Sequence, residues 1–160
     1  RNDIEVEGRK ISGTGGVIDG DTLFFQGTLL VDFDPLRMIE AFMDNVAASR
    51  QKKIMNMSSA VGSIDMTFPG QVFYRSSKAA LNMAIRTVSK EVKRDPDPKR
   101  KALIFGLINP GIVDTGFAKN VPVPMITARE SAEKCITLIE GYTAEKSGMF
   151  FDYKGAKLPW

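Results

Sequence analysis

From residue 35 onward, apolar residues alternate between helical stripes and short continuous runs. Stripes with helical spacing predict helices over three segments: Pro35 to about Ala48, Tyr74 to about Val92, and Thr127 or Ala128 to about Leu138. Short apolar runs predict buried strands at 53–57, 102–108 and 148–153. This alternation is typical of an α/β protein, so the pattern predicts a parallel sheet flanked by helices.

Local signals at the ends of these segments agree with the pattern. Asp34 and Pro35 suit the N-cap and the first position of a helix. Thr127 and Glu130 form a plausible capping box for the last helix. The Pro-rich stretch 94–98 ends the long central helix, because proline cannot continue it.

Residues 1–31 lack this organisation. The first ten residues are charged, a glycine cluster follows at 12–16, and apolar runs at 22–26 and 28–31 suggest two strands. A dinucleotide-binding loop should follow a hydrophobic strand and open a helix. The segment before the glycines is a poor strand, and the chain reaches another turn at 19–21. We therefore interpret the glycine cluster as a turn.

The composition of the chain excludes several kinds of catalytic, metal-binding and disulfide site. The chain has 160 residues, which indicates a single domain, and its net charge is +3. It contains no histidine, so histidine-based triads and metal sites are ruled out, and we expect no bound metal. Its one cysteine, Cys135, allows no intrachain disulfide, as is usual in a reducing compartment.

Charge and hydropathy argue against nucleic acid and membrane partners. One basic cluster surrounds the Pro-rich turn, and it includes Lys90, Lys93, Arg94, Lys99, Arg100 and Lys101. No aromatic residues alternate with it, so we interpret it as a solvated helix end and not as a nucleic-acid site. The sequence shows no signal peptide and no apolar run approaching ~18 residues, so we expect a soluble, cytoplasmic protein.

Tyr74 and Lys78 stand one helical turn apart and share one face of the predicted helix. A free phenol titrates near ~10 and a free lysine near ~10.4. A nearby cation favours the phenolate, so Lys78 can lower the pKa of Tyr74. Such a phenol can donate or remove a proton at a carbonyl or alcohol oxygen. The same spacing is also common on solvated helix surfaces, so the pair alone does not decide between the two interpretations.

The neighbouring motifs favour the chemical interpretation. The run Met57-Ser58-Ser59 closes the strand before this helix, and Asn109-Pro110-Gly111 closes the strand after it. This order resembles the short-chain dehydrogenase/reductase family, with its Rossmann-like parallel sheet. The segments 74–83 and 147–160 are most similar to the C-factor and sniffer-like carbonyl reductases. The resemblance covers 35–160, roughly four-fifths of the chain, within a single domain 1–160 of which 1–31 match poorly.

The resemblance implies a role for each matching residue. Tyr74 would be the catalytic acid/base, and Lys78 would lower its pKa and bind the ribose of NADP(H) or NAD(H). Ser59 would hydrogen-bond a small carbonyl or alcohol substrate, with Ser58 as the other candidate. The remaining roles fall to Asn45, which would hold a water in a proton relay, to Pro110 and Gly111 at the floor of the nicotinamide site, and to Val113 and Thr115 against the carboxamide or the phosphates.

The sequence also departs from the family. The amino-terminal glycine-rich cofactor loop and the Asn-Asn-Ala-Gly element are missing. Three explanations stay open: segments of a longer protein are missing from this sequence, the chain is a truncated or rearranged paralogue, or residues 1–31 rebuild part of the cofactor site. Jumps in the family pattern near Val46-Ala47 favour the first.

Two functions follow from these observations. The first is an NAD(P)-dependent oxidoreductase that moves hydride between the cofactor and a carbonyl or alcohol. The second is a non-catalytic binding or signalling protein built on a degenerate form of the fold. The family's helix packing further implies a homodimer, for which the small residues Ala79, Ala80 and Ala84 offer a surface. The loop between Thr115 and Thr127 should set substrate specificity.

Overall fold

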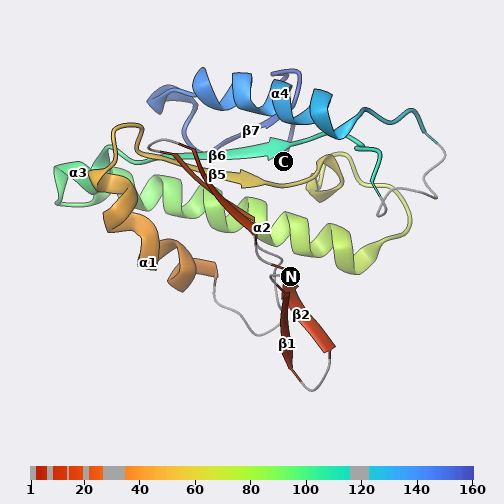
Figure 1. Ribbon diagram of the computed structural model, residues 1–160, viewed down its shortest axis with the longest axis horizontal. Helices are drawn as coiled ribbons and strands as arrows, with labels where there is room; N and C mark the ends of the chain where they lie inside the picture. The colour runs from red at the N-terminus through yellow and green to blue at the C-terminus, as the bar shows by residue number, and fades with distance from the viewer. Residues whose placement is uncertain (1–2, 7–8, 14, 20–21, 27–34, 116–122) are drawn as a thin grey trace.

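The computed structural model describes residues 3–6, 9–13, 15–19, 22–26, 35–115 and 123–160, with side chains from residue 42 onward. Its centre is a parallel sheet of three strands in the order β5-β6-β7 (Figure 1). The strands are β5 (Lys53–Met57), β6 (Ile104–Asn109) and β7 (Met149–Asp152). The predicted strands and their parallel arrangement are therefore confirmed.

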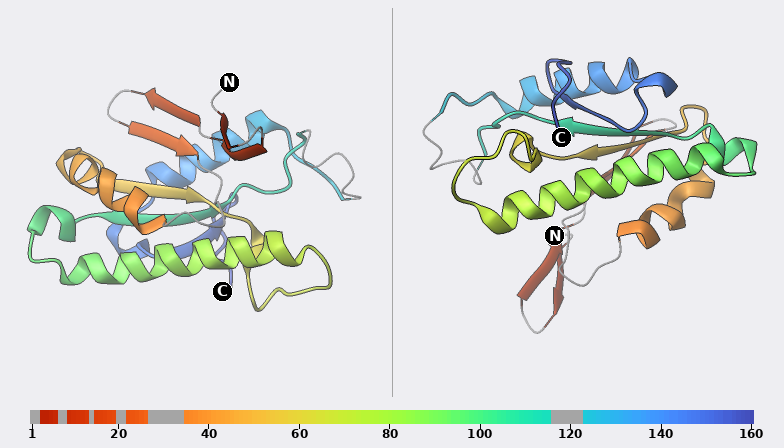
Figure 2. Two further views of the ribbon diagram at one scale, coloured as in Figure 1. Left: turned by 90° about the horizontal axis from the view of Figure 1, so that it is seen from below. Right: turned by 180° about the vertical axis from the view of Figure 1, so that it is seen from behind.

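Helices cover both faces of this sheet. Helices α1 (Pro35–Ala48) and α2 (Val72–Glu91) lie on one face, and α4 (Ala128–Glu140) lies on the other (Figures 1 and 2). A short helix, α3 (Pro98–Lys101), follows α2. The Rossmann-like arrangement of a parallel sheet between helices is thus confirmed. No helix in the described part of the chain is long and apolar enough to cross a membrane.

Strand β6 lies between the two layers of the core. Phe105 and Leu107 are fully buried among residues of α1, α2 and β7. Ile108 is packed with Cys135 and Ile139 of α4. Successive side chains of a strand point to opposite faces, so this alternation fills both layers. Cys135 is buried and carries a free thiol.

The ends of the helices follow the signals in the sequence to different degrees. The Thr127 side chain accepts a hydrogen bond from the Glu130 backbone N–H at 3.1 Å and so caps α4 as predicted. Helix α2 begins at Val72, two residues before the predicted start. Its N-cap, Gln71, has a left-handed backbone with φ of 53° and provides no side-chain cap.

Ala80 and Met83 of α2 are exposed, and a homodimer through this face stays a prediction.

The described residues before α1 form two separate antiparallel hairpins. Strands β1 (Asp3–Val6) and β2 (Arg9–Gly13) make the first, which projects away from the sheet in both figures. Strands β3 (Gly15–Asp19) and β4 (Thr22–Gln26) make the second, and β4 contacts β5. The strand predicted at 22–26 is confirmed, while the one at 28–31 lies outside the described residues. The glycine cluster at 12–16 largely lies within β2 and β3 and precedes no helix.

Candidate active site

The carboxyl ends of β5 and β6 lie at the same edge of the sheet because the two strands are parallel. Ser58 and Ser59 follow β5 directly, and Pro110 and Gly111 follow β6. The amino-terminal end of α2, which carries Tyr74, approaches the same edge (Figure 1). Ligand sites of open parallel sheets occur at this edge, at the ends of neighbouring strands.

The two serines differ in their surroundings. Ser58 is buried, its backbone N–H donates to the Ile108 carbonyl at 2.7 Å, and its hydroxyl donates to the Asn82 side-chain oxygen. Ser58 therefore holds the end of β5 against β6 and α2. Ser59 is half-buried, and its hydroxyl does not cap the short helix η1 (Ala60–Gly62) that follows. Of the two, Ser59 is the better placed to hydrogen-bond a ligand.

Tyr74 and Lys78 lie one turn apart on α2, and both are half-buried. The Lys78 ammonium nitrogen is 5.8 Å from the centroid of the Tyr74 ring and donates to the Met57 carbonyl at 3.5 Å. Burial lowers the pKa of Lys78, since desolvation disfavours its charged form. The ammonium group therefore lies beside the end of β5, with the Tyr74 ring on the side of the helix next to it.

Two residues that the sequence interpretation missed fix this arrangement. Gly62 packs so closely on α2 that a Cβ at its position would lie 2.7 Å from the Lys78 Cβ. Asn82 is buried, accepts from Ser58 and donates to the Gly62 carbonyl at 3.5 Å. Asn82 thus links the end of β5 and η1 to the helix that carries Lys78. Its signal in the sequence is an amide on the inner stripe of α2, four residues after Lys78 and three before Ile85.

The turn after β6 is held by contacts from distant segments. Gly111 has a left-handed backbone with φ of 84°, and a Cβ there would lie 2.8 Å from the Tyr153 ring. The Pro110 carbonyl accepts from the Ser131 hydroxyl of α4 at 2.7 Å. Val113 forms a parallel bridge with Ile126. These contacts fix Pro110, Gly111 and Val113 after the end of β6, at the same edge of the sheet where Ser59 follows β5.

Two predicted site residues stand apart from this group. Thr115 is exposed, at the last described position before 123. Asn45 is exposed near the carboxyl end of α1. Its neighbour Asp44 pairs with Arg100 of α3 at 2.7 Å, at the opposite end of the molecule from the start of α2 (Figure 1). The structure does not bring Asn45 together with Ser59, Tyr74 and Lys78.

Comparison with known proteins gives two results that overlap in the chain. C-signal from Myxococcus xanthus is 32% identical over 127 residues, which cover 79% of this chain and 72% of that protein. The family model for the lipoyl protein ligase A/B catalytic domain matches residues 1–86. The second match includes both hairpins and extends into α2.

Solved structures agree with the first result. A carbonyl reductase from chicken fatty liver, solved with NADPH, superposes with a TM-score of 0.69 at 27% identity and covers 79% of this chain and 52% of its own. A short-chain dehydrogenase/reductase from Burkholderia multivorans with bound NADP gives 0.63 at 29%, covering 79% and 51%. The chain spans about half the length of several curated relatives as well. The resemblance seen in the sequence is thus confirmed: the chain belongs to the short-chain dehydrogenase/reductase family and, through residues 1–86, also to the lipoyl protein ligase A/B catalytic domain family.

Proposed function

We propose that this chain carries the catalytic half of an oxidoreductase that transfers hydride between NADP(H) or NAD(H) and a carbonyl or alcohol. One observation carries the proposal: Ser59 follows β5 directly, and Lys78, one helical turn from Tyr74, donates to the Met57 carbonyl at the end of the same strand. Relatives of known structure include carbonyl reductases solved with NADPH or NADP. The chain's own groups include a phenol, a hydroxyl and an ammonium, which are the groups that carbonyl reduction needs.

Each of these side chains has a separate task in the proposal. Tyr74 donates its phenolic proton to the substrate oxygen during reduction and removes it during oxidation. Lys78 places a positive charge beside the phenolate and favours its formation. Ser59 donates a hydrogen bond to the same substrate oxygen and fixes its position. The nicotinamide, when bound, supplies or accepts the hydride.

The residues present fit one end of the cofactor and not the other. Lys78 and the turn at Pro110 and Gly111 offer an ammonium donor and a tightly held backbone for the nicotinamide ribose. A pyrophosphate needs a glycine-rich loop that opens a helix at the end of a parallel strand. In the described part of 3–26, the chain instead forms two antiparallel hairpins. The described residues of these hairpins therefore do not fit a pyrophosphate.

This mismatch supports a second candidate function. A protein that keeps the carboxyl-terminal part of the fold without a pyrophosphate loop can serve as a non-catalytic binding protein. NADPH binding separates the two candidates, because a ligand at 100 times its dissociation constant adds about 2.7 kcal/mol to the free energy of unfolding. A thermal shift with NADPH favours the oxidoreductase, and its absence favours the binding protein.

Turnover tests the oxidoreductase proposal directly. The purified chain should oxidise NADPH in the presence of small aldehydes or ketones. Tyr74→Phe should keep the thermal shift and lose about 10²- to 10⁴-fold in kcat, because it removes the proton donor alone. Tyr142→Phe is the matched control: its hydroxyl donates to the Met149 carbonyl, remote from the site, and kcat should not change. No turnover by the wild type with any carbonyl, or equal rates for Tyr74→Phe, would contradict the proposal.

A further inference from the structure

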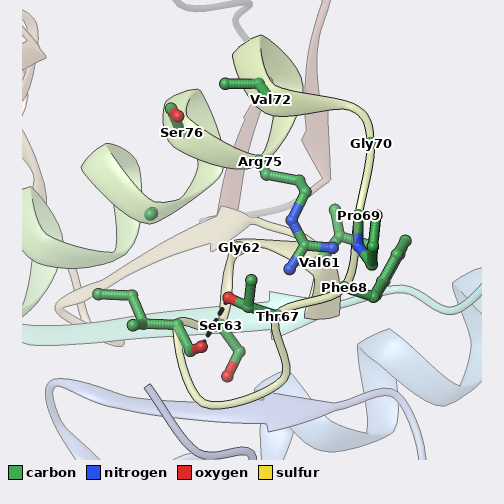
Figure 3. A pocket seen from close by; sticks show the side chains of 12 residues that line it. Val61, Gly62, Ser63, Thr67, Phe68, Pro69, Gly70, Val72, Arg75 and Ser76 are labelled. Carbon is green, nitrogen blue, oxygen red and sulfur yellow. Dashed lines mark hydrogen bonds between the residues drawn. The ribbon is translucent and has the colours of Figure 1, made fainter.

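A hollow lies beside α2, next to a different stripe of the helix from the one that carries Tyr74 and Lys78. It has a volume of about 330 Å³ and is enclosed by the loop 61–70 and the start of α2 (Figure 3). Helix residues Val72, Arg75, Ser76 and Ala79 line it. These positions follow the spacing of one helical stripe, and Tyr74 and Lys78 belong to another. Its volume is at the lower end of the range for ligand pockets.

Arg75 is the central feature of this hollow. Its side chain is buried, with 8% exposed, and the guanidinium stacks on the Phe68 ring at 4.1 Å. One terminal nitrogen donates to the Met66 carbonyl at 3.3 Å. The other, Nη1, is buried and has no hydrogen-bond partner among the described residues. Figure 3 shows the guanidinium extending from α2 into the space beside Phe68 and Pro69.

The surroundings leave this positive charge uncompensated. No carboxylate in the described part of the chain forms an ion pair with Arg75. The loop's hydroxyls are engaged locally, because Ser63 accepts from the Met66 N–H and Thr67 donates to the Ile64 carbonyl. A buried charge without a partner is unfavourable, and arginine satisfies it best with a carboxylate or a phosphate.

The end of α2 adds to the positive potential. The first N–H groups of a helix are unpaired within it and attract anions. Gln71 provides no side-chain cap for them, and Val72 also lines the hollow. The helix end and the unpartnered guanidinium are two independent features that favour a negative ligand group at the same place.

The rest of the lining selects among anions. It is mostly apolar, and Val61, Phe68 and Pro69 face the hollow. At the rim, Ile64 and Val72 are 68% and 67% exposed. Phosphate alone leaves this apolar surface uncovered, whereas a carboxylate with a hydrocarbon chain covers it and pairs with Arg75. We propose that this hollow is a binding site for an apolar monocarboxylate, with Arg75 as the residue that binds its carboxylate.

Binding of sodium octanoate to the full chain, measured by titration calorimetry, tests the site without any cofactor. Octan-1-ol, which lacks the charge, and inorganic phosphate, which lacks the chain, should each bind at least about 10-fold more weakly than octanoate. Arg75→Gln should weaken octanoate binding by about 10- to 100-fold, the loss expected for a charged hydrogen bond. Arg86→Gln is the matched control, because Arg86 also stacks on a ring, that of Trp160, at 4.1 Å on the same helix. It should bind octanoate as the wild type does.

Three outcomes would overturn the proposal: no octanoate binding, phosphate binding as tight as octanoate binding, or equal affinities in Arg75→Gln and the wild type. Circular dichroism establishes whether Arg75→Gln is folded. If it is not, the wild type labelled with ¹⁵N-arginine decides. Octanoate should then shift the side-chain resonance of Arg75 and leave that of Arg86 in place, and the reverse result contradicts the site.

Discussion

The hairpins at 3–26 and the α/β part at 35–160 are built by opposite kinds of contact. In the second hairpin Asp19 pairs with Thr22, so the partners are near neighbours in sequence. In the parallel sheet Lys53 pairs with Ile104, and a helix must form and pack before the two strands meet. Pairing between residues that are close in sequence costs little loop-closure entropy, but it buries little apolar surface. A two-stranded hairpin alone is therefore only marginally stable in water. Pairing between residues that are distant in sequence costs more loop-closure entropy, which a hydrophobic core must offset. The α/β part has such a core.

The two family memberships overlap and do not divide at the same place as the two regions, because the match to the lipoyl protein ligase family runs to residue 86. The hairpins fall within the match to the lipoyl protein ligase A/B catalytic domain. The proposed site residues Ser59, Tyr74 and Lys78 lie inside the same match, but their proposed roles come from the resemblance to the short-chain dehydrogenase/reductase family. Relatives of that family are about twice as long as the part that this chain covers. The proposed chemistry therefore depends on the α/β part, and the other end of the cofactor has no site in the described hairpins.

Phe105→Ala should give the largest effect. Phe105 is fully buried near the start of β6, and removing a buried phenylalanine side chain costs about 3–5 kcal/mol of unfolding free energy. Deleting residues 1–26 should change the urea midpoint of the α/β part far less, because that part has its own core. Urea unfolding followed by the fluorescence of Trp160 measures both. If the deletion costs as much as Phe105→Ala, the two regions fold as one unit and the comparison fails.

The segments of the α/β part were predictable because their apolar spacing reflects that core. Helices α1 and α4 and all three parallel strands follow the pattern to within a few residues. The pattern could not reveal Gln71, whose left-handed backbone starts α2 early, because nothing in its side chain requires it. It also gave no position in space for Asn45, since motif order alone does not show which end of the sheet a helix reaches.

Gly111→Ala should sharpen the comparison by showing that loops of the α/β part are held from a distance. A side chain at Gly111 meets both an unfavourable φ and the Tyr153 ring, and we expect a loss of about 2–4 kcal/mol. Gly155→Ala is the control, since its φ is 85° but no atom lies within 4 Å of the new Cβ. It should cost only about 1 kcal/mol, from backbone strain alone. Equal losses in thermal unfolding would show that the contact with Tyr153 contributes nothing.

Asn82→Ala should cost about 1–3 kcal/mol, because it leaves the buried Ser58 hydroxyl without its acceptor and the Gly62 carbonyl without its donor. The change should also lower NADPH turnover, since η1 would no longer be fixed against Lys78. Thr87→Ala, at an exposed position of α2, is the control and should alter neither stability nor rate. An Asn82 variant with full stability would mean that the end of β5 is held by its strand pairing alone.

The smallest effect expected is a pH dependence from Lys78. Burial lowers its pKa in the folded chain, while the unfolded chain keeps a value near ~10.4. Between these two values the unfolded state binds more protons, so the free energy of unfolding should rise with pH across that interval. Lys78→Met lacks the titrating group, and the wild type should gain stability relative to it over this interval. Urea titrations at successive alkaline pH values measure the difference. A difference that stays constant or falls would show that the Lys78 ammonium is as well solvated in the folded chain as in the unfolded one, and that the edge of the sheet beside Tyr74 does not exclude water.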